Sequence, residues 1–231
     1  MLILALDSST SAVTVAVASV GESDEREVLA EISIYSHGAS EALLPAAHSA
    51  LNLAGVDLDK VERILVGLGP GTFTGIRIAL AAARSLSLAT DVPLSSNSTL
   101  AALAAPALVT AESSEVLAVL DARRREVFTQ RFTEGGMRSE ILCVAPKEFI
   151  ASRRARDTPL VVVGDGAVRY REELLALGRI PPDTSPLHRV RATGHVLSAD
   201  LSPVPAHEVV PLYVREPDAE VRKDLNPWST A

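Results

Sequence analysis

The chain has 231 residues, 22 basic and 29 acidic, with a formal net charge of −7. This length suits one large domain or two small ones, and the acidic balance argues against a free-standing nucleic-acid-binding protein. The lone Cys143 excludes an internal disulfide and a cysteine-based zinc cluster. With no basic leader and no apolar run of the ~20 residues that a membrane span needs, we expect a soluble, cytoplasmic protein.

The first part of the chain predicts three strands and a helix. Apolar or alternating runs predict strands over residues 2–6, 12–19 and 27–35. Short polar turns separate them, which favours hairpins with antiparallel pairing. The helix is expected over residues 36–54, with Ser40 as its N-cap and with Pro45 placed where it would shift the start or kink the helix.

A strand, a glycine-rich turn and a helix come next, and the rest of the chain is organised around them. Residues 64–68 form an apolar strand that the turn at residues 69–71 ends. The helix over residues 75–89, capped by Thr72 or Thr74, is apolar around most of its circumference. A helix that is apolar on two sides needs two surfaces. We infer that one is the domain's own sheet and the other is another protein.

The second half of the chain mixes strands and helices again. An Ala/Thr/Ser-rich stretch at residues 106–114 predicts a domain boundary. Strands are expected over residues 92–95, 116–121, 126–132, 141–144 and 160–163. Helices are expected over residues 98–104, 146–152, 168–177 and 192–201. The order of elements predicts an α/β fold in which an antiparallel hairpin edges a partly parallel sheet.

Three polar or glycine-rich turns are candidates for contacts to a phosphate or nucleotide. They comprise Asp7, Ser8, Ser9 and Thr10, then Gly69 and Gly71, and finally Gly164 and Gly166. None matches a P-loop or a dinucleotide fingerprint. Each also has a purely structural explanation, as a polar hairpin turn or a tight strand-to-helix turn that needs small residues.

Other polar groups give no catalytic or metal-binding pattern. His37, Glu41 and His48 lie near one stripe of the first helix, but no His-Glu-x-x-His motif or third ligand accompanies them. The run from Arg123 to Arg125 could meet RNA phosphates, or it could be a solvated hairpin tip. We therefore predict no catalytic and no metal-binding residue.

Taken together, these stretches resemble the bacterial TsaB family, the accessory subunits of the machinery that makes threonylcarbamoyladenosine in tRNA. The resemblance rests most on the run Gly69-Pro-Gly-Thr-Phe-Thr-Gly-x-Arg77, and it extends to Leu4-Ala-Leu-Asp7, Asp121-Ala-Arg123, Gly164-Asp-Gly166 and Tyr213-x-Arg215. It implies a two-lobed actin-like fold of the sugar kinase/Hsp70 ATPase type, with mixed sheets flanked by helices. The implied lobes are residues 1–107 and 108–191, with residues 192–231 packing back on the first.

The resemblance also implies a function. The related catalytic subunit, TsaD, binds a metal through a His-x-x-x-His motif, whose two positions fall here near Thr99 and Leu103. Neither residue can bind a metal, so the chain matches the non-catalytic relative. The implied role is to activate TsaD, which transfers threonylcarbamoyl from threonylcarbamoyl-AMP to the adenosine next to the anticodon. The implied partners are TsaD, the ATPase TsaE and a second copy, with tRNA met only through the complex.

No tightly bound cofactor is expected, although a nucleotide at a subunit interface stays open. The alternatives are an independent ATPase or kinase of the same fold and, third, a metallopeptidase. The predicted interface comprises Leu43, Leu44, Ile76, Ala79, Leu80, Ala82, Ala83 and Leu86. Burying four or five such leucines or isoleucines gives roughly 6–15 kcal/mol, and association costs of about 4–15 kcal/mol offset much of it. We therefore expect an exchangeable dimer.

Overall fold

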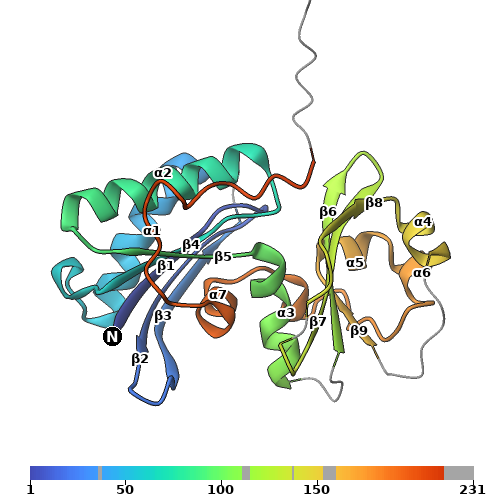
Figure 1. Cartoon of the computed structure of the whole chain (residues 1–231), viewed down its shortest axis with the longest axis horizontal. Helices are drawn as coiled ribbons and strands as arrows, with labels where there is room; N and C mark the ends of the chain where they lie inside the picture. Colours follow the sequence, from blue (N-terminus) through green and yellow to red (C-terminus); the bar gives the residue numbers. More distant parts are fainter. Residues whose placement is uncertain (36–37, 111–114, 137, 153–159, 216–231) are drawn as a thin grey trace, which may run out of the picture.

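A computed structural model describes residues 1–35, 38–110, 115–136, 138–152 and 160–215. Within these ranges the strands form a five-stranded sheet of order β3-β2-β1-β4-β5 and a four-stranded sheet of order β8-β7-β6-β9. Figure 1 shows the two sheets side by side, each with helices against it, and with α3 and α7 between them. None of the described helices is long and apolar enough to cross a membrane.

The first sheet combines an antiparallel meander with two parallel strands. Its strands are β1 (Leu2–Asp7), β2 (Val13–Val20), β3 (Arg26–Ile34), β4 (Arg63–Gly67) and β5 (Leu94–Asn97). The strands β1, β2 and β3 pair antiparallel, whereas β4 pairs parallel with both β1 and β5. The three hairpin-linked strands and the following parallel strand therefore agree with the sequence prediction.

Both faces of this sheet are covered, which explains why its central strands are apolar throughout. Helices α1 (Ala39–Ala54) and α2 (Phe73–Thr90) pack against the face that carries Leu4 and Leu6. Helix α7 (Ala192–Ser198) packs against the opposite face, where Ile3 and Ala5 lie. Because successive strand residues point to opposite faces, one short strand supplies both cores.

The start of α1 differs from the sequence prediction. Its N-cap is Gly38, and no side chain caps the helix, so the prediction that Ser40 is the N-cap was wrong. Pro45 lies inside the helix. Gly55 closes it in a left-handed conformation and donates its backbone N–H to the carbonyls of Asn52 and Leu51. A 3₁₀ turn, η1 (Leu58–Lys60), then leads into β4.

The second sheet is built in the same way on a smaller scale. Its strands are β6 (Glu115–Arg123), β7 (Glu126–Thr133), β8 (Leu142–Val144) and β9 (Leu160–Val163). Helix α3 (Thr99–Thr110) packs on one face, and α4 (Pro146–Ala151), α5 (Asp165–Arg169) and α6 (Arg171–Leu174) pack on the other. A second 3₁₀ turn, η2 (Pro186–His188), precedes α7.

One predicted helix in this lobe is divided in two. The sequence predicts a single helix over residues 168–177, but α5 begins at Asp165 and Tyr170 separates it from α6. Gly178, expected to end the helix, serves another purpose: a Cβ there would collide with the carbonyl oxygen of Leu160. The glycine therefore allows the chain to pass close to β9.

The border between the lobes involves α3 and α7. The predicted boundary between residues 107 and 108 falls inside α3, whose apolar side chains pack with β6, β7 and β9. We therefore propose that the second lobe begins near residue 98. Helix α7 lies against α3 at Gly194, where a Cβ would collide with the carbonyl oxygen of Ala102. The two helices thus touch backbone to backbone between the sheets.

Candidate functional site between the two lobes

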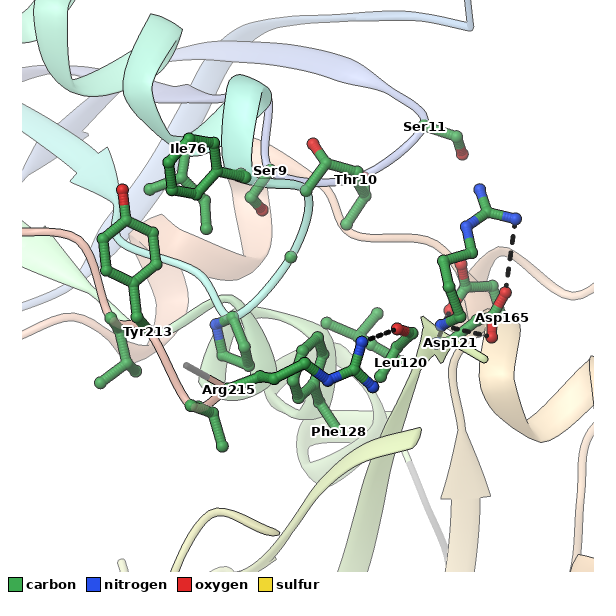
Figure 2. A pocket seen from close by; sticks show the side chains of 18 of the residues that line it. Ser9, Thr10, Ser11, Ile76, Leu120, Asp121, Phe128, Asp165, Tyr213 and Arg215 are labelled. Carbon is green, nitrogen blue, oxygen red and sulfur yellow. Dashed lines mark hydrogen bonds and ion pairs between the residues drawn. The ribbon is translucent and has the colours of Figure 1, made fainter. Parts of the chain in front are cut away.

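A cavity of about 570 Å³ lies between the two lobes. The β1–β2 turn and the β4–α2 turn line it from the first lobe, and the β6–β7 turn lines it from the second. Residues 204–215, here called the C-terminal strap, contribute Leu212 to Arg215. Figure 2 shows the Thr10 and Ile76 side chains on one side of this space and those of Asp121 and Phe128 across from them.

A buried aspartate–histidine pair lies beneath the first-lobe turns that line the cavity. Asp7, at the end of β1, and His195, on α7, are each 0% exposed, and Nε2 of His195 lies 2.6 Å from Oδ2 of Asp7. Thr99 donates its hydroxyl to the same carboxylate at 3.2 Å, and Ser9 donates its backbone N–H at 2.5 Å. Burial by itself would raise the pKa of Asp7, but the His195 and Ser9 contacts hold it below its ordinary value.

The first predicted phosphate turn is closed by the chain's own contacts. Ser8 and Ser9 are buried; Ser8 donates its hydroxyl to the carbonyl of Gly75, and the Ser9 hydroxyl bonds to that of Thr99. The carbonyl of Ser9 accepts the backbone N–H of Thr72 at 2.6 Å. Burial and these bonds speak against a phosphate contact by the Asp7 carboxylate, whereas Ser9 borders the cavity and Ser8 borders a smaller neighbouring one. Thr10 does line the cavity.

The glycines of the β4–α2 turn have a packing role. At Gly71 and Gly75 a Cβ would collide with the carbonyl oxygens of Ser9 and Ser8, so the two turns lie backbone against backbone. Gly69 has a φ of 95° and is buried against Ile76. Of the two glycines proposed as phosphate contacts here, Gly71 lines the cavity and Gly69 lies beneath it.

The third predicted phosphate turn is packed against β6 in the same manner. Gly164 has a φ of 116°, a Cβ there would collide with the carbonyl oxygen of Val119, and its N–H donates to Nδ1 of His188. Gly166 is buried beside Val119. Asp165 reaches the cavity and accepts the backbone N–H of Asp121. Burial, reinforced by the charge of Asp121, raises the pKa of Asp165.

The β6–β7 turn brings positive charge to the cavity. Arg123 and Arg124 line it, and the Arg123 side chain is 74% exposed. The largely buried carboxylate of Asp121 lies 3.5 Å from Arg123 and 2.8 Å from Arg169, so it is shared between two guanidinium groups. The predicted basic hairpin tip is therefore present.

The C-terminal strap forms the remaining wall and fastens it to α2. Leu212 donates its N–H to the carbonyl of Leu68, and Arg84 donates to the carbonyl of Val209, which is buried in the first core. The Tyr213 ring stacks on Phe73 with centroids 5.3 Å apart. The sequence predicts only an extended piece here, and it gives no signal for His195 as the partner of Asp7.

The predicted interface residues separate into two groups. Five of them lie in the first lobe's own core and are 0–4% exposed: Leu43, Ile76, Ala79, Leu80 and Ala83. The structure contradicts their assignment to an interface, because a partner could reach them only by opening that core. Leu44 and Leu86 instead line a groove of about 300 Å³ between α1 and α2, here called the α1–α2 groove. Ala82 is half-buried beside the core.

The two positions that the resemblance assigns to metal ligands lie inside the fold. Thr99 begins α3 and bonds to Asp7, whereas Leu103 packs in the core of the second lobe. In the parts of the chain that the structure describes, no three His, Cys, Asp or Glu side chains gather as metal ligands would. Catalytic metal chemistry therefore has no support at this place.

Comparisons with known proteins agree with this picture. The model of the family "TsaD: tRNA N6-adenosine threonylcarbamoyltransferase" matches residues 31–155. An uncharacterised protein of Mycobacterium tuberculosis is 31% identical over 94% of this chain and 93% of its own. The threonylcarbamoyladenosine biosynthesis protein TsaB of Bacillus subtilis is 28% identical over 96% of this chain and 97% of its own.

Solved structures give the same result. YeaZ from Pseudomonas aeruginosa superposes with a TM-score of 0.73 at 27% identity, covering 92% of this chain and 99% of its own. Component A of the (R)-2-hydroxyglutaryl-CoA dehydratase from Acidaminococcus fermentans, at a TM-score of 0.52 and 12% identity over 90% of this chain and 99% of its own, shares the fold alone. The fold is thus the two-lobed actin-like ATPase fold, and the chain belongs to the TsaB/YeaZ family with a TsaD-like domain.

Proposed function

We propose that this chain is a non-catalytic scaffold subunit of the complex that forms threonylcarbamoyladenosine in tRNA. In that role it binds TsaD and holds it in the state that transfers threonylcarbamoyl from threonylcarbamoyl-AMP to the adenosine beside the anticodon. TsaE is the further partner, and tRNA meets the chain in the assembled complex. The family membership places the chain in this pathway, and the scaffold role is the proposal.

The observation that carries this proposal is the burial of Thr99 and Leu103, the two residues at the positions of the metal ligands. A metal-dependent transferase would need ligands here that face a substrate, whereas these two side chains are fully buried and contribute to the fold. The Thr99 hydroxyl is hydrogen-bonded to the Asp7 carboxylate and to the Ser9 hydroxyl. A mutation to histidine at either position would therefore disturb the core before it made a metal site.

The surface that supports a partner is the α1–α2 groove. Leu44 is 49% exposed on α1, and Leu86 faces it from α2, with His48 and Asn52 adding polar groups at the rim. Apolar centres surrounded by polar residues are typical of protein–protein interfaces. We propose that this groove binds TsaD and, when TsaD is absent, a second copy of the chain.

An independent ATPase or kinase is the alternative function. The activator of the 2-hydroxyisocaproyl-CoA dehydratase from Clostridium difficile, of similar fold, carries bound ADPNP. In this chain the β1–β2 and β4–α2 turns pack against one another through Ser9 and Gly71, and the β9–α5 turn packs against β6 through Gly164. We therefore propose that no nucleotide is held tightly between the lobes, and that any nucleotide binds where the chain meets TsaD. A metallopeptidase has no support in the described residues.

The test is reconstitution with TsaD. The wild-type chain is expected to co-purify with TsaD and to raise threonylcarbamoyladenosine formation on unmodified tRNA supplied with threonylcarbamoyl-AMP. Leu44→Glu should reduce both. The matched control is Leu175→Glu, since Leu175 is 53% exposed in the second lobe and outside the α1–α2 groove. Modification that proceeds equally without the chain, or robust ATP hydrolysis by the chain alone, would overturn the scaffold role.

A further inference from the structure

The C-terminal strap passes from one lobe to the other between two adjacent residues. Through Tyr213 it is held by the first lobe: Val209 is 0% exposed in the first core, and the Tyr213 hydroxyl accepts the Nε–H of Arg77 at 2.9 Å. Val214 instead packs against the core of the second lobe. The strap therefore crosses the border between the lobes within one peptide unit.

Arg215 completes the attachment to the second lobe. Its guanidinium group donates to the backbone carbonyl of Ala122 on β6 at 3.1 Å and pairs with the carboxylate of Glu126 on β7. It also lies 3.5 Å from the Sγ of Cys143 on β8. One side chain thus contacts three neighbouring strands of the second sheet. Arginine–carboxylate hydrogen bonds are charge-assisted, and this side chain is only 25% exposed, so salt screens the pair less than an exposed one.

The strap and the contact between α3 and α7 join the lobes at two separate places. In Figure 1, α3 and α7 lie low between the sheets, whereas the strap, at the red end of the colour range, runs above them along α2 to the second lobe. The strap forms one wall of the cavity of about 570 Å³. Lobes that are joined at one place rotate about it by default. A second attachment away from that place opposes the rotation.

We propose that Val214 and Arg215, here called the clasp, fix the angle between the lobes and with it the width of the cavity. A segment of the chain itself then bridges the two lobes along the cavity. Because Arg84 on α2 holds the Val209 carbonyl at 2.8 Å, the clasp also keeps the β6–β7 hairpin in a fixed position relative to α2. Release of Arg215 lets the second lobe swing about the contact between α3 and α7. This inference does not depend on the binding of TsaD.

The test measures the distance between the lobes with two spin labels in the full-length chain. The labels are attached at Glu22→Cys in the first lobe and Lys147→Cys in the second, both exposed positions, in a Cys143→Ser background. Labelled chain is diluted into an excess of unlabelled chain, so that only distances within one chain contribute. Pulsed electron paramagnetic resonance should give one narrow distance distribution. Arg215→Ala should broaden it or shift its mean by about 2 Å or more, the scale of a domain rearrangement.

The matched control removes a similar arginine whose partners all belong to one lobe. Arg171 pairs with the carboxylate of Asp183 and donates to the backbone carbonyls of Ile180 and Pro181, all in the second lobe. Arg171→Ala should therefore lower stability without changing the distance between the lobes. A general loosening of the second lobe would change the distribution in this variant as well.

A second variant acts on the other end of the clasp. Tyr213→Ala removes the ring that stacks on Phe73 and the hydroxyl that Arg77 bonds to, and both partners lie in the first lobe. It leaves the contacts of Arg215 in place, yet it should also broaden the distribution, because the strap then holds one lobe less firmly. A distribution that stays unchanged in both Arg215→Ala and Tyr213→Ala, in chains whose circular dichroism shows them folded, would overturn the inference. Equal broadening in Arg171→Ala would overturn it too.

Discussion

The buried pair of Asp7 and His195 gives the sharpest prediction for stability. Replacing His195 with leucine keeps a similar side-chain volume but leaves the fully buried carboxylate of Asp7 with only its Ser9 and Thr99 donors. Removing the partner of a buried charge costs about 3–5 kcal/mol, because the remaining charge stays desolvated. We therefore expect His195→Leu to lower the free energy of unfolding by about that amount at pH 7.

A second substitution tests whether the charge is the cause. Asp7→Asn added to His195→Leu removes the unpaired charge, so the double variant should be more stable than His195→Leu alone. Urea denaturation followed by circular dichroism measures both differences through the transition midpoints. The reasoning is refuted if His195→Leu loses less than about 1 kcal/mol, or if the second substitution destabilises the protein further.

The pH dependence has a defined sign. In the wild-type protein the pKa of Asp7 is lowered, so its contribution is complete above the unfolded-state pKa of about 3.9 and is lost as the pH falls below it. In His195→Leu burial is no longer offset by the histidine, so we expect the pKa of Asp7 to rise above its unfolded value. The deficit of the variant should therefore shrink as the pH falls from 7 towards 4. A deficit that stays constant over this range would assign the loss to packing.

Four further variants test the packing and the backbone conformation. Gly194→Val should destabilise the protein by about 1–3 kcal/mol or more in urea denaturation, because a Cβ there collides with the backbone of α3. Ala83→Arg should unfold the chain, because this position lies in the first core. Leu44→Glu should leave the melting temperature unchanged and weaken self-association, as measured by sedimentation. Arg124→Asn/Arg125→Gly should raise stability by about 1–3 kcal/mol, since left-handed arginines are replaced by residues that favour this conformation; an unchanged melting temperature would count against it.

Local pattern was sufficient for most elements of the fold. The alternation and apolar runs of β1, β2 and β4 indicate the central strands, and the turns between them indicate the antiparallel meander. The division of α5 from α6 was missed because their helical pattern continues across Tyr170. The N-cap at Gly38 was missed because Ser40 offered a more usual capping residue.

The sequence could not show which face of α2 is exposed, because that helix is rich in alanine. An alanine-rich helix shows several apolar stripes of similar strength, so periodicity cannot decide which stripe packs on the sheet. The structure buries the stripe of Ala79 and Ala83 inside the lobe, while Leu86 is partly buried beside the core and lines the α1–α2 groove. The presence of a helix was predictable, but the face that it presents depends on where β4 and α1 lie.

The candidate site depends on contacts that no local pattern encodes. Asp7 and His195 are 188 residues apart in the sequence, and only the return of α7 to the first sheet brings them together. His195 has no motif around it, and its neighbour Gly194 matters through the backbone of α3. Sequence reasoning could identify Asp7 as a polar residue ending a strand, but it could not tell whether that carboxylate faces a ligand or another side chain.

Whether the polar groups of the β1–β2 turn bond to a ligand or to the chain itself decides what role the turn has. A phosphate bound to the backbone of Ser9 would have to displace the bond from the Thr72 N–H to the Ser9 carbonyl and the bond from the Ser9 N–H to Asp7. These bonds hold the start of α2 against β1, and α2 carries one wall of the α1–α2 groove. The residues that look like a phosphate cradle therefore fix the position of the proposed docking surface. Opening the cradle for a ligand would move that surface, which is the opposite of what a scaffold requires.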